Sequence, residues 1–176
     1  FLSEQTPPDA LVALLNEHFT AMTEIIFRYR GTLDKYIGDE IMAVFGAPLS
    51  EPDDAERAIA AAVAMQRANA ELNDRRVSEG RPAFEMGIGV DTGEVVAGYV
   101  GSPDRMEFTV VGDRVNTARR LCSMAGPSQI VVGEATYRIA RHLVDARAIG
   151  TVLLKGKATP VHAYEVTGLR TPADRT

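Results

Sequence analysis

Two short apolar segments flank a Gly-Asp pair in residues 33–46, and this run constrains the fold more than any other stretch. The segments at 33–37 and 41–45 have the apolar content of short strands, and the second has the character of a buried one. Gly38 and Asp39 between them suit the tight turn of an antiparallel hairpin. A carboxylate at the tip of such a hairpin is well placed to bind a metal ion, although solvated Gly-Asp turns are also common. We therefore expect a β-hairpin with Asp39 at its tip.

Helical and strand-like patterns alternate along the rest of the chain. Capping residues and helical spacing predict helices over 6–29, from 50 to the loop at 79–82, over 115–124 and over 134–140. Alternating or short apolar runs predict strands over 84–90, 95–100, 108–111, 129–132 and 161–166, with a hairpin around Lys155. We expect strands 84–90 and 95–100 to pair through a turn at 91–94. With a further strand expected before residue 1, this order predicts a ferredoxin-like α+β fold, an antiparallel sheet with helices on one face.

The composition is that of a single globular domain, which we place at 1–170, followed by a tail at 171–176. The chain has 176 residues, 45% of them hydrophobic, enough for a core without disulfides. Its net charge of −5 argues against broad nucleic-acid binding, and a single cysteine, Cys122, excludes an intrachain disulfide or a multi-thiolate metal site. We see no uninterrupted apolar run of membrane-spanning length and no signal segment, so we expect a cytoplasmic segment without membrane contact.

A second polar motif follows the strand at 108–111, where a glycine turn leads into a helix that carries Asn116 and Arg120. Residues four apart lie on one face of a helix. An amide and a guanidinium aimed together suit a ribose oxygen and the negative charge that develops on phosphorus. A solvated polar face is the alternative, and it fits Arg119 better than Asn116. The chain has no Walker A pattern and no Gly-x-Ser-x-Gly elbow, and its three histidines are scattered.

Taken together, these motifs resemble the class III nucleotidyl cyclase catalytic domain. The resemblance rests on Asp34-Lys35-x-x-Gly38-Asp39 before an apolar strand and Gly46-Ala47-Pro48. It rests equally on the downstream run Thr109-Val110-Val111-Gly112-Asp113-x-Val115-Asn116-x-Ala118-x-Arg120, on residues 101–105 and on the 155–157 hairpin. Several motifs in the right order, spread from Phe1 to about Val166, are more specific than any single pattern.

The resemblance implies an adenylate cyclase that converts ATP into 3′,5′-cyclic AMP and pyrophosphate. In that family two divalent cations, Mg²⁺ or Mn²⁺, act in active sites that a head-to-tail homodimer shares. The resemblance also implies a role for each matched residue: metal binding by Asp39, purine reading by Lys35 and Thr109, ribose orientation by Asn116, transition-state stabilisation by Arg120, and phosphate binding by Lys155.

One departure concerns the metal site. The family's first metal aspartate lies on a strand before the segment that matches Phe1, and no acidic residue of this sequence replaces it. We expect a longer working protein, with a regulatory domain fused upstream.

The substrate and the activity also leave alternatives open. ATP is the expected substrate, but a threonine hydroxyl both donates and accepts, so a guanylate cyclase is an alternative. A non-catalytic nucleotide-binding regulatory module is another. A cyclic-dinucleotide synthase fits less well, because Ile37 and Ile41 depart from its signature loop.

Overall fold

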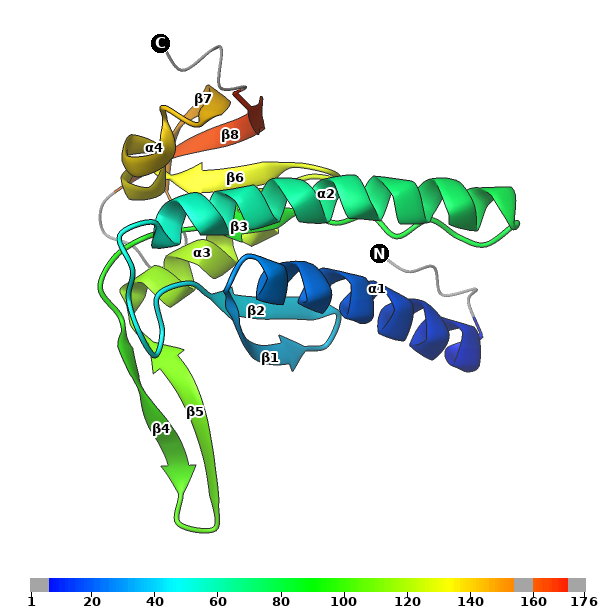
Figure 1. Cartoon of the computed structure of the whole chain (residues 1–176), viewed down its shortest axis with the longest axis horizontal. Helices are drawn as coiled ribbons and strands as arrows, with labels where there is room; N and C mark the ends of the chain where they lie inside the picture. The colour runs from blue at the N-terminus through cyan, green and yellow to red at the C-terminus, as the bar shows by residue number, and fades with distance from the viewer. Residues whose placement is uncertain (1–6, 154–159, 171–176) are drawn as a thin grey trace.

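The computed structural model describes residues 7–153 and 160–170. Two long helices, α1 (Pro8–Arg28) and α2 (Asp54–Ser78), run side by side, and the hairpin of β1 (Thr32–Ile37) and β2 (Glu40–Val44) lies next to α1 (Figure 1). The remaining elements, in chain order, are β3 (Ile88–Val90), β4 (Val96–Ser102), β5 (Arg105–Val111), α3 (Asp113–Met124), β6 (Ile130–Gly133), α4 (Glu134–Ala140), β7 (Val144–Val152) and β8 (Val161–Leu169).

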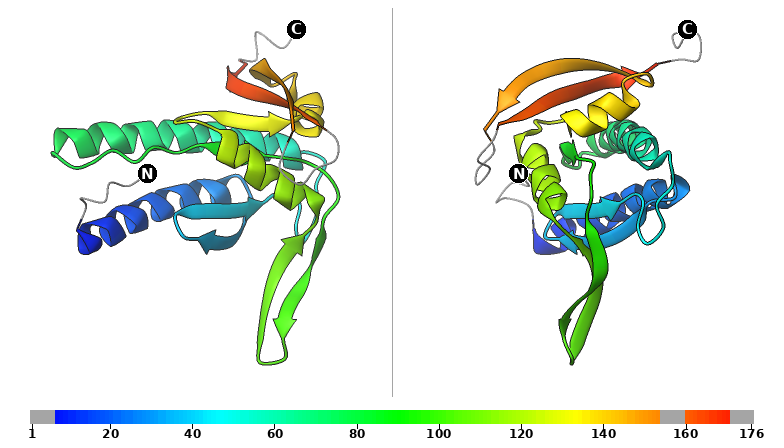
Figure 2. Two further views of the ribbon diagram at one scale, coloured as in Figure 1. Left: turned by 180° about the vertical axis from the view of Figure 1, so that it is seen from behind. Right: turned by 90° about the vertical axis from the view of Figure 1, so that its left-hand side faces the viewer.

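The strands form one central sheet and two separate hairpins. The central sheet has the order β3-β6-β8-β7, with β3 and β6 parallel and the other pairs antiparallel. The β1–β2 and β4–β5 hairpins are paired only within themselves among the described residues. The β4–β5 hairpin extends well away from the body of the molecule (Figures 1 and 2). The α+β class and the opening hairpin at 33–45 are confirmed, as are the four helices.

One predicted strand pairing was wrong. Residues 84–90 do not pair with 95–100: only 88–90 form a strand, which pairs with β6, while β4 pairs with β5. The connecting segment explains the difference, because it is tied to other elements. Asp91 lies 3.3 Å from Arg114 on α3, and the Thr92 hydroxyl is 2.8 Å from that of Thr136 on α4. These contacts hold the segment against the body, so the chain enters β4 instead of folding back along β3.

Helices cover both faces of the central sheet at β6, because successive side chains of a strand point to opposite faces. On one face α2 and α4 bury the larger core cluster against the sheet, formed by Ile59, Ala62, Val63, Ile130, Val132, Ala140, Val144 and Val166. On the other face Leu121 of α3 packs against Val131 and Ala163. The expected helical layer is therefore α2 with α4, and α3 adds a second layer opposite to it.

Helix α1 is long and apolar enough, by length and composition alone, to cross a membrane, and it is the one such helix in the described residues. Charged and polar residues interrupt its apolar positions, which is why the sequence did not predict a possible span here. A core helix passes the same test, so the indication is weak. Met22, Ile25 and Ile26 of α1 are buried, and Glu17 accepts a hydrogen bond from the fully buried Arg76 of α2 over 2.8 Å.

Candidate active site

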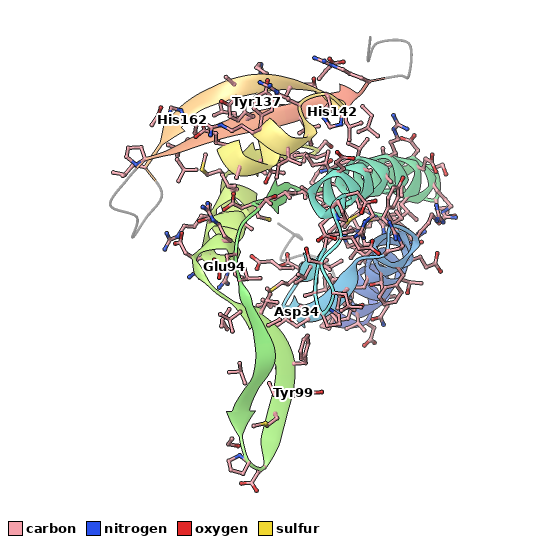
Figure 3. All side chains as sticks on the ribbon, turned by 60° about the vertical axis from the view of Figure 1, so that its left-hand side comes forward. Asp34, Glu94, Tyr99, Tyr137, His142 and His162 are labelled. Atoms are coloured by element: carbon pink, nitrogen blue, oxygen red, sulfur yellow. The ribbon has the colours of Figure 1, made fainter. Side chains whose placement is uncertain are left out.

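Lys35 and Thr109, expected to read the purine, meet around a third residue, Asp34. The Thr109 hydroxyl donates a hydrogen bond to Asp34 Oδ2 over 2.9 Å, and Lys35 Nζ lies 3.6 Å from the same oxygen. The Asp34 side chain is only 4% exposed and Thr109 is 8% exposed. Figure 3 shows Asp34 where the β1–β2 hairpin meets the foot of the β4–β5 hairpin. We call Asp34, Lys35 and Thr109 the base-reading corner, after the role that the sequence predicts for Lys35 and Thr109.

A β-bulge brings Asp34 into this position. Leu33 pairs with Ala43 and Lys35 pairs with Met42, so Asp34 is the extra residue of β1. In a regular strand the side chains of consecutive residues point to opposite faces, whereas a bulge re-aims one of them. The bulge therefore brings the side chains of Asp34 and its neighbour Lys35 to the same side of the strand, where they form an ion pair. Sequence reasoning gave Asp34 no role, because no local pattern marks a bulge within an apolar strand.

Lys35 lies between two carboxylates. Besides Asp34, its Nζ is 3.7 Å from Glu107 Oε2 on β5. Glu107 is about half exposed and also accepts a hydrogen bond from Arg105 over 3.1 Å. The Lys35 ammonium, itself 34% exposed, is thus held near β5 while part of it stays open to solvent. Together, the Asp34 and Glu107 carboxylates fix the position of this ammonium better than either would alone.

The catalytic pair predicted on α3 is present on an open helix face. Asn116 is exposed and Arg120 is half-buried. Within residues 7–153 and 160–170, neither side chain makes a hydrogen bond or an ion pair. The helix that carries them lies tightly against β3, because Gly89 has no side chain: a Cβ there would stand 2.1 Å from the backbone nitrogen of Cys122. Helix α3 is therefore packed closely against β3, while the two polar side chains have no bonded partner among the described residues.

The turn that carries Asp39 lies next to α3 of the same chain. Gly38 has a φ of 63°, the left-handed conformation that a tight hairpin turn requires and glycine adopts easily. Glu40 Oε2 lies 3.7 Å from Arg119 Nε, which ties the turn to α3. Burial raises the pKa of the Cys122 thiol on α3, and the nearby Glu40 and Asp39 carboxylates raise this pKa further. Asp39 is exposed and makes no hydrogen bond or ion pair in the described part of the chain.

These features make Asp39 a suitable ligand for a divalent cation. Mg²⁺ and Mn²⁺ prefer hard oxygen ligands, and Mg²⁺ is commonly held by one or two carboxylates together with substrate phosphates. A carboxylate without a protein cation beside it keeps its oxygens available for such an ion. The residues present therefore fit a metal at this turn, with the remaining ligands coming from elsewhere.

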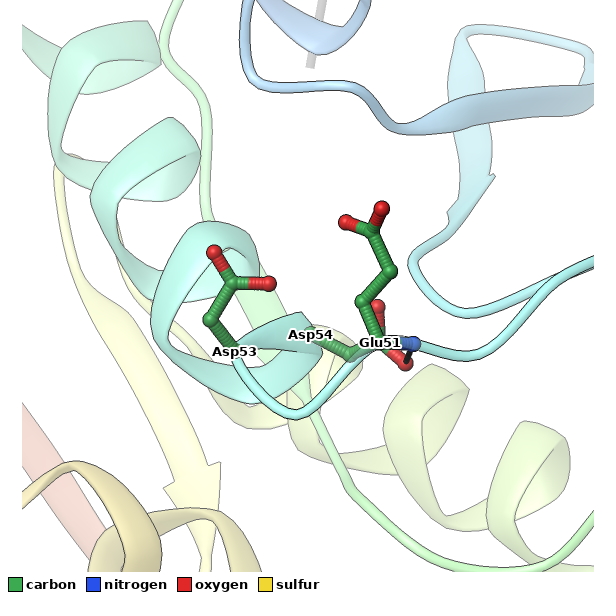
Figure 4. A group of neighbouring side chains, drawn as sticks. All are labelled: Glu51, Asp53 and Asp54. Carbon is green, nitrogen blue, oxygen red and sulfur yellow. Dashed lines mark hydrogen bonds between the residues drawn. The ribbon is translucent and has the colours of Figure 1, made fainter.

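A different acidic group can be set aside as a metal site. Oxygens of Glu51, Asp53 and Asp54 lie within 4.8 Å of one another (Figure 4). Arg57 Nε donates to Asp53 over 2.9 Å, and its guanidinium also contacts Asp54 and lies 3.2 Å from Glu51. The same guanidinium donates to two backbone carbonyls that follow α1. The cluster already has its cation, and it joins the end of α1 to the start of α2.

Lys155, the expected phosphate-binding residue, lies outside the described residues, as does the Lys155-Gly156-Lys157 turn. The strands on either side, β7 and β8, pair as the antiparallel hairpin that the sequence predicts. The structure therefore places the two strands but leaves the role of Lys155 a prediction.

The β4–β5 hairpin, which we call the arm, exposes an unusual amount of apolar surface. Its outward-facing residues are Val96, Tyr99, Val100, Met106, Phe108 and Val111. Tyr99 is 72% exposed and projects from the ribbon (Figure 3), with its ring edge-on to Phe108 at a centroid distance of 5.5 Å. Contiguous exposed apolar surface of this kind marks an interaction site.

Comparison with known families shows to which family the chain belongs. A model of the adenylate and guanylate cyclase catalytic domain matches residues 1–168. The chain therefore belongs to this family of cyclase catalytic domains.

Individual relatives include cyclases of both kinds. The chain is 33% identical to Adenylate cyclase 1 of Rhizobium meliloti (strain 1021), over 96% of this chain and 26% of that protein. Among solved structures, the guanylyl cyclase Cya2 is similar at 40% identity with a TM-score of 0.87, covering 96% of this chain and 86% of that one. The adenylyl cyclase CyaB from P. aeruginosa is similar at 32% identity with a TM-score of 0.90, covering 96% and 88%. These structures confirm the class III cyclase fold.

The chain spans roughly a quarter to a third of the length of the curated relatives that it matches. Family membership defines a nucleotide cyclase domain, whereas the choice between ATP and GTP differs among the relatives.

Proposed function

We propose that this chain is the catalytic domain of an adenylate cyclase, which forms 3′,5′-cyclic AMP and pyrophosphate from ATP. The observation that carries the proposal is the cationic donor Lys35, held by Asp34 and Glu107 beside the Thr109 hydroxyl. An ammonium group only donates hydrogen bonds, and adenine N1 is an acceptor whereas guanine N1 carries a hydrogen. This difference favours ATP.

The residues of the catalytic end fit the chemistry of this reaction. Asp39 is the residue that would hold a divalent cation, Mg²⁺ or Mn²⁺, and two such ions would neutralise charge on the attacking and leaving oxygens. Asn116 would orient the ribose so that its 3′-hydroxyl faces the α-phosphate. Arg120 would donate to the phosphoryl oxygens as negative charge develops on them. Lys155 would bind the terminal phosphates.

We propose further that two copies form a homodimer with shared active sites. Lys35 lies within β1 and Asp39 lies in the following turn, yet the purine and the phosphates are at opposite ends of a nucleotide. One copy of the hairpin therefore suits one end of the substrate only. Each site would take Asp39 from one subunit, and Lys35, Thr109, Asn116, Arg120 and Lys155 from the other. The exposed apolar arm offers surface for such an association.

Two related functions belong beside this proposal. A guanylate cyclase is favoured by the 40% identity to a guanylyl cyclase of known structure. A non-catalytic nucleotide-binding domain would need the same base-reading corner but not the catalytic pair. We also propose a regulatory domain fused upstream and a cytosolic setting for the cyclase domain; the first is in keeping with the relatives' greater length.

The test is direct identification of the product. The full-length natural protein is incubated with equal concentrations of ATP and GTP and with Mg²⁺ or Mn²⁺, and the products are identified by mass spectrometry. We expect 3′,5′-cyclic AMP in excess. Cyclic GMP in excess would replace the proposal by the guanylate cyclase, and no cyclic product with either metal would leave only a nucleotide-binding domain.

A further inference from the structure

The Thr109 hydroxyl has its only hydrogen committed to another residue. A hydroxyl carries one hydrogen and two acceptor lone pairs, and an ionised carboxylate can only accept. In the 2.9 Å contact between Thr109 Oγ1 and Asp34 Oδ2, Thr109 must therefore be the donor. Both groups are buried, with the Asp34 side chain 4% exposed, so water competes little for this bond. What remains on Thr109 for a substrate is a lone pair.

From this arrangement we propose that Asp34 is a positioning residue that sets the purine preference by making Thr109 an acceptor. The inference rests on the proposed function, in which Lys35 and Thr109 face the edge of the base. It goes beyond that proposal, because a threonine hydroxyl can in general donate or accept, whereas Thr109 beside Asp34 can only accept from the base. Asp34 itself does not contact the substrate in this account.

The polarity of Thr109 matches adenine and opposes guanine. Adenine presents an amino group at position 6, a donor, where guanine presents a carbonyl oxygen, an acceptor. With Lys35 donating to the ring nitrogen, an acceptor at Thr109 completes the pattern for adenine. Guanine would place its carbonyl oxygen against the lone pair of Thr109 Oγ1. Both oxygens are acceptors, so neither would find a donor. A buried unpaired group of this kind typically changes an equilibrium constant by about ten- to a hundredfold.

Asp34 is better placed for this task than for simple charge balance. Glu107 already supplies Lys35 with a carboxylate at 3.7 Å, close to the 3.6 Å of Asp34. Among the described residues Glu107 makes no hydrogen bond with Thr109, whereas Asp34 reaches it from another hairpin through the bulge in β1. Because a bulge re-aims a side chain, it places the Asp34 carboxylate where it accepts the Thr109 hydrogen as well as contacting Lys35.

The test measures nucleotide preference by binding as well as by turnover. The full-length natural protein is titrated with 3′-deoxy-ATP and 3′-deoxy-GTP in the presence of Mg²⁺. Both nucleotides lack the attacking hydroxyl and cannot cyclise. Asp34→Leu removes the acceptor from Thr109, and we expect the ratio of ATP-type to GTP-type affinity to fall about tenfold. Asp34→Asn keeps an acceptor oxygen without the charge, and it should keep most of the preference.

Two controls separate this role from a structural one. Glu107→Gln removes the other carboxylate that holds Lys35, so it should weaken the binding of both nucleotides. It leaves Thr109 an acceptor, however, and should therefore lower the affinity ratio less than Asp34→Leu does. In a Thr109→Ala background, Asp34→Leu should no longer change the ratio, because the two residues act as a unit. A merely structural role would weaken both nucleotides alike. An unchanged ratio in folded Asp34→Leu would overturn the proposal, as would Asp34→Asn losing as much preference as Asp34→Leu.

A variant that leaves Asp34 intact keeps the inference testable should Asp34→Leu fail to fold. Thr109→Val deletes the lone pair, so the ratio should fall with it, whereas a ratio that rises would mean that Thr109 donates to the base. Binding and turnover also fail separately. A protein whose affinity ratio falls in Asp34→Leu but which forms no cyclic product supports the role of Asp34 and refutes the cyclase. A protein that forms cyclic AMP while Asp34→Leu leaves the ratio unchanged refutes the role of Asp34 and supports the cyclase.

Discussion

The two ends of the proposed site differ in whether their polar side chains already have hydrogen-bond or ion-pair partners within the chain. At the base-reading corner, Lys35, Asp34 and Thr109 are already bonded to one another and largely buried. At the catalytic end, Asp39, Asn116 and Arg120 have no hydrogen-bond or ion-pair partner among the described residues. We call these three residues the open end of the site.

This difference follows from what each end has to recognise. A neutral base is recognised by the direction of its hydrogen bonds, so the groups that read it gain from being fixed in advance. Metal ions and phosphates bring their own charge, and side chains that bind developing charge must be free to meet it in the transition state. If the open end depends on Asp39 and Arg120 in this way, replacing either of them should lower turnover far more than stability.

Replacing Asp39 by alanine should remove turnover almost completely. The change deletes the carboxylate proposed to hold a cation, and metal ions supply several kcal/mol of transition-state stabilisation, so we expect a loss of at least about a thousandfold. The fold should persist, because an exposed turn carboxylate with no bonded partner contributes little stability. Turnover is measured with Mg²⁺ and with Mn²⁺, and thermal unfolding is followed in parallel. Asp74→Ala, an exposed carboxylate on α2, is the control. Normal turnover by Asp39→Ala would show that the open end does not bind metal through this residue.

Arg120→Ala should lower kcat by about a hundred- to a thousandfold while KM changes little. The guanidinium is proposed to meet charge that exists only in the transition state, and one such donor typically contributes roughly 2.7–4 kcal/mol. Arg119→Ala is the matched control, because Arg119 adjoins Arg120 but is engaged by Glu40 at 3.7 Å. It should alter kcat far less. A defect in KM alone would mean that Arg120 binds ground-state phosphate.

Mixing two inactive variants should restore up to about half of the wild-type activity per heterodimer. Asp39→Ala and Lys35→Ala lie at opposite ends of the shared site, so one site of the mixed dimer collects both lesions and the other has none. Activity is assayed after subunit exchange has been verified. Lys35→Ala mixed with Arg120→Ala is the control, since both lesions come from the same side and every site keeps one. Exchange without recovery in the first mixture would contradict the shared site.

The sequence predicted the elements of the open end better than those of the base-reading corner. The Gly38-Asp39 turn and the helix with Asn116 and Arg120 are local features, set by turn chemistry and helical spacing, and both are present. The helix at 134–140 is confirmed at both ends for the same reason.

What the sequence could not predict depends on contacts distant along the chain. Asp34 meets Thr109 only because of a bulge in β1 and the approach of β5, neither of which has a local signature. Strand pairing failed likewise, since β3 pairs with β6 across the whole of the arm and α3. The sequence therefore singled out Asp39, Asn116 and Arg120, which lie in elements with local signatures. It missed Asp34, whose partner lies in a strand that is distant in the sequence.

The smallest effect concerns the support beneath the open end, where His18 of α1 is buried against Phe84 at a ring distance of 4.2 Å. Burial lowers the pKa of His18 to about 4, and the Arg76 cation lowers it further, although Asp39 and Glu17 act in the opposite direction. Because the unfolded chain binds this proton near pH 6.5, the neutral histidine costs nothing above that pH. Stability should fall as the pH drops from about 6.5 to about 4, by up to ~3 kcal/mol. Thermal unfolding across this range should show a shallower slope for His18→Phe, and an equal slope would mean that His18 is protonated within the fold.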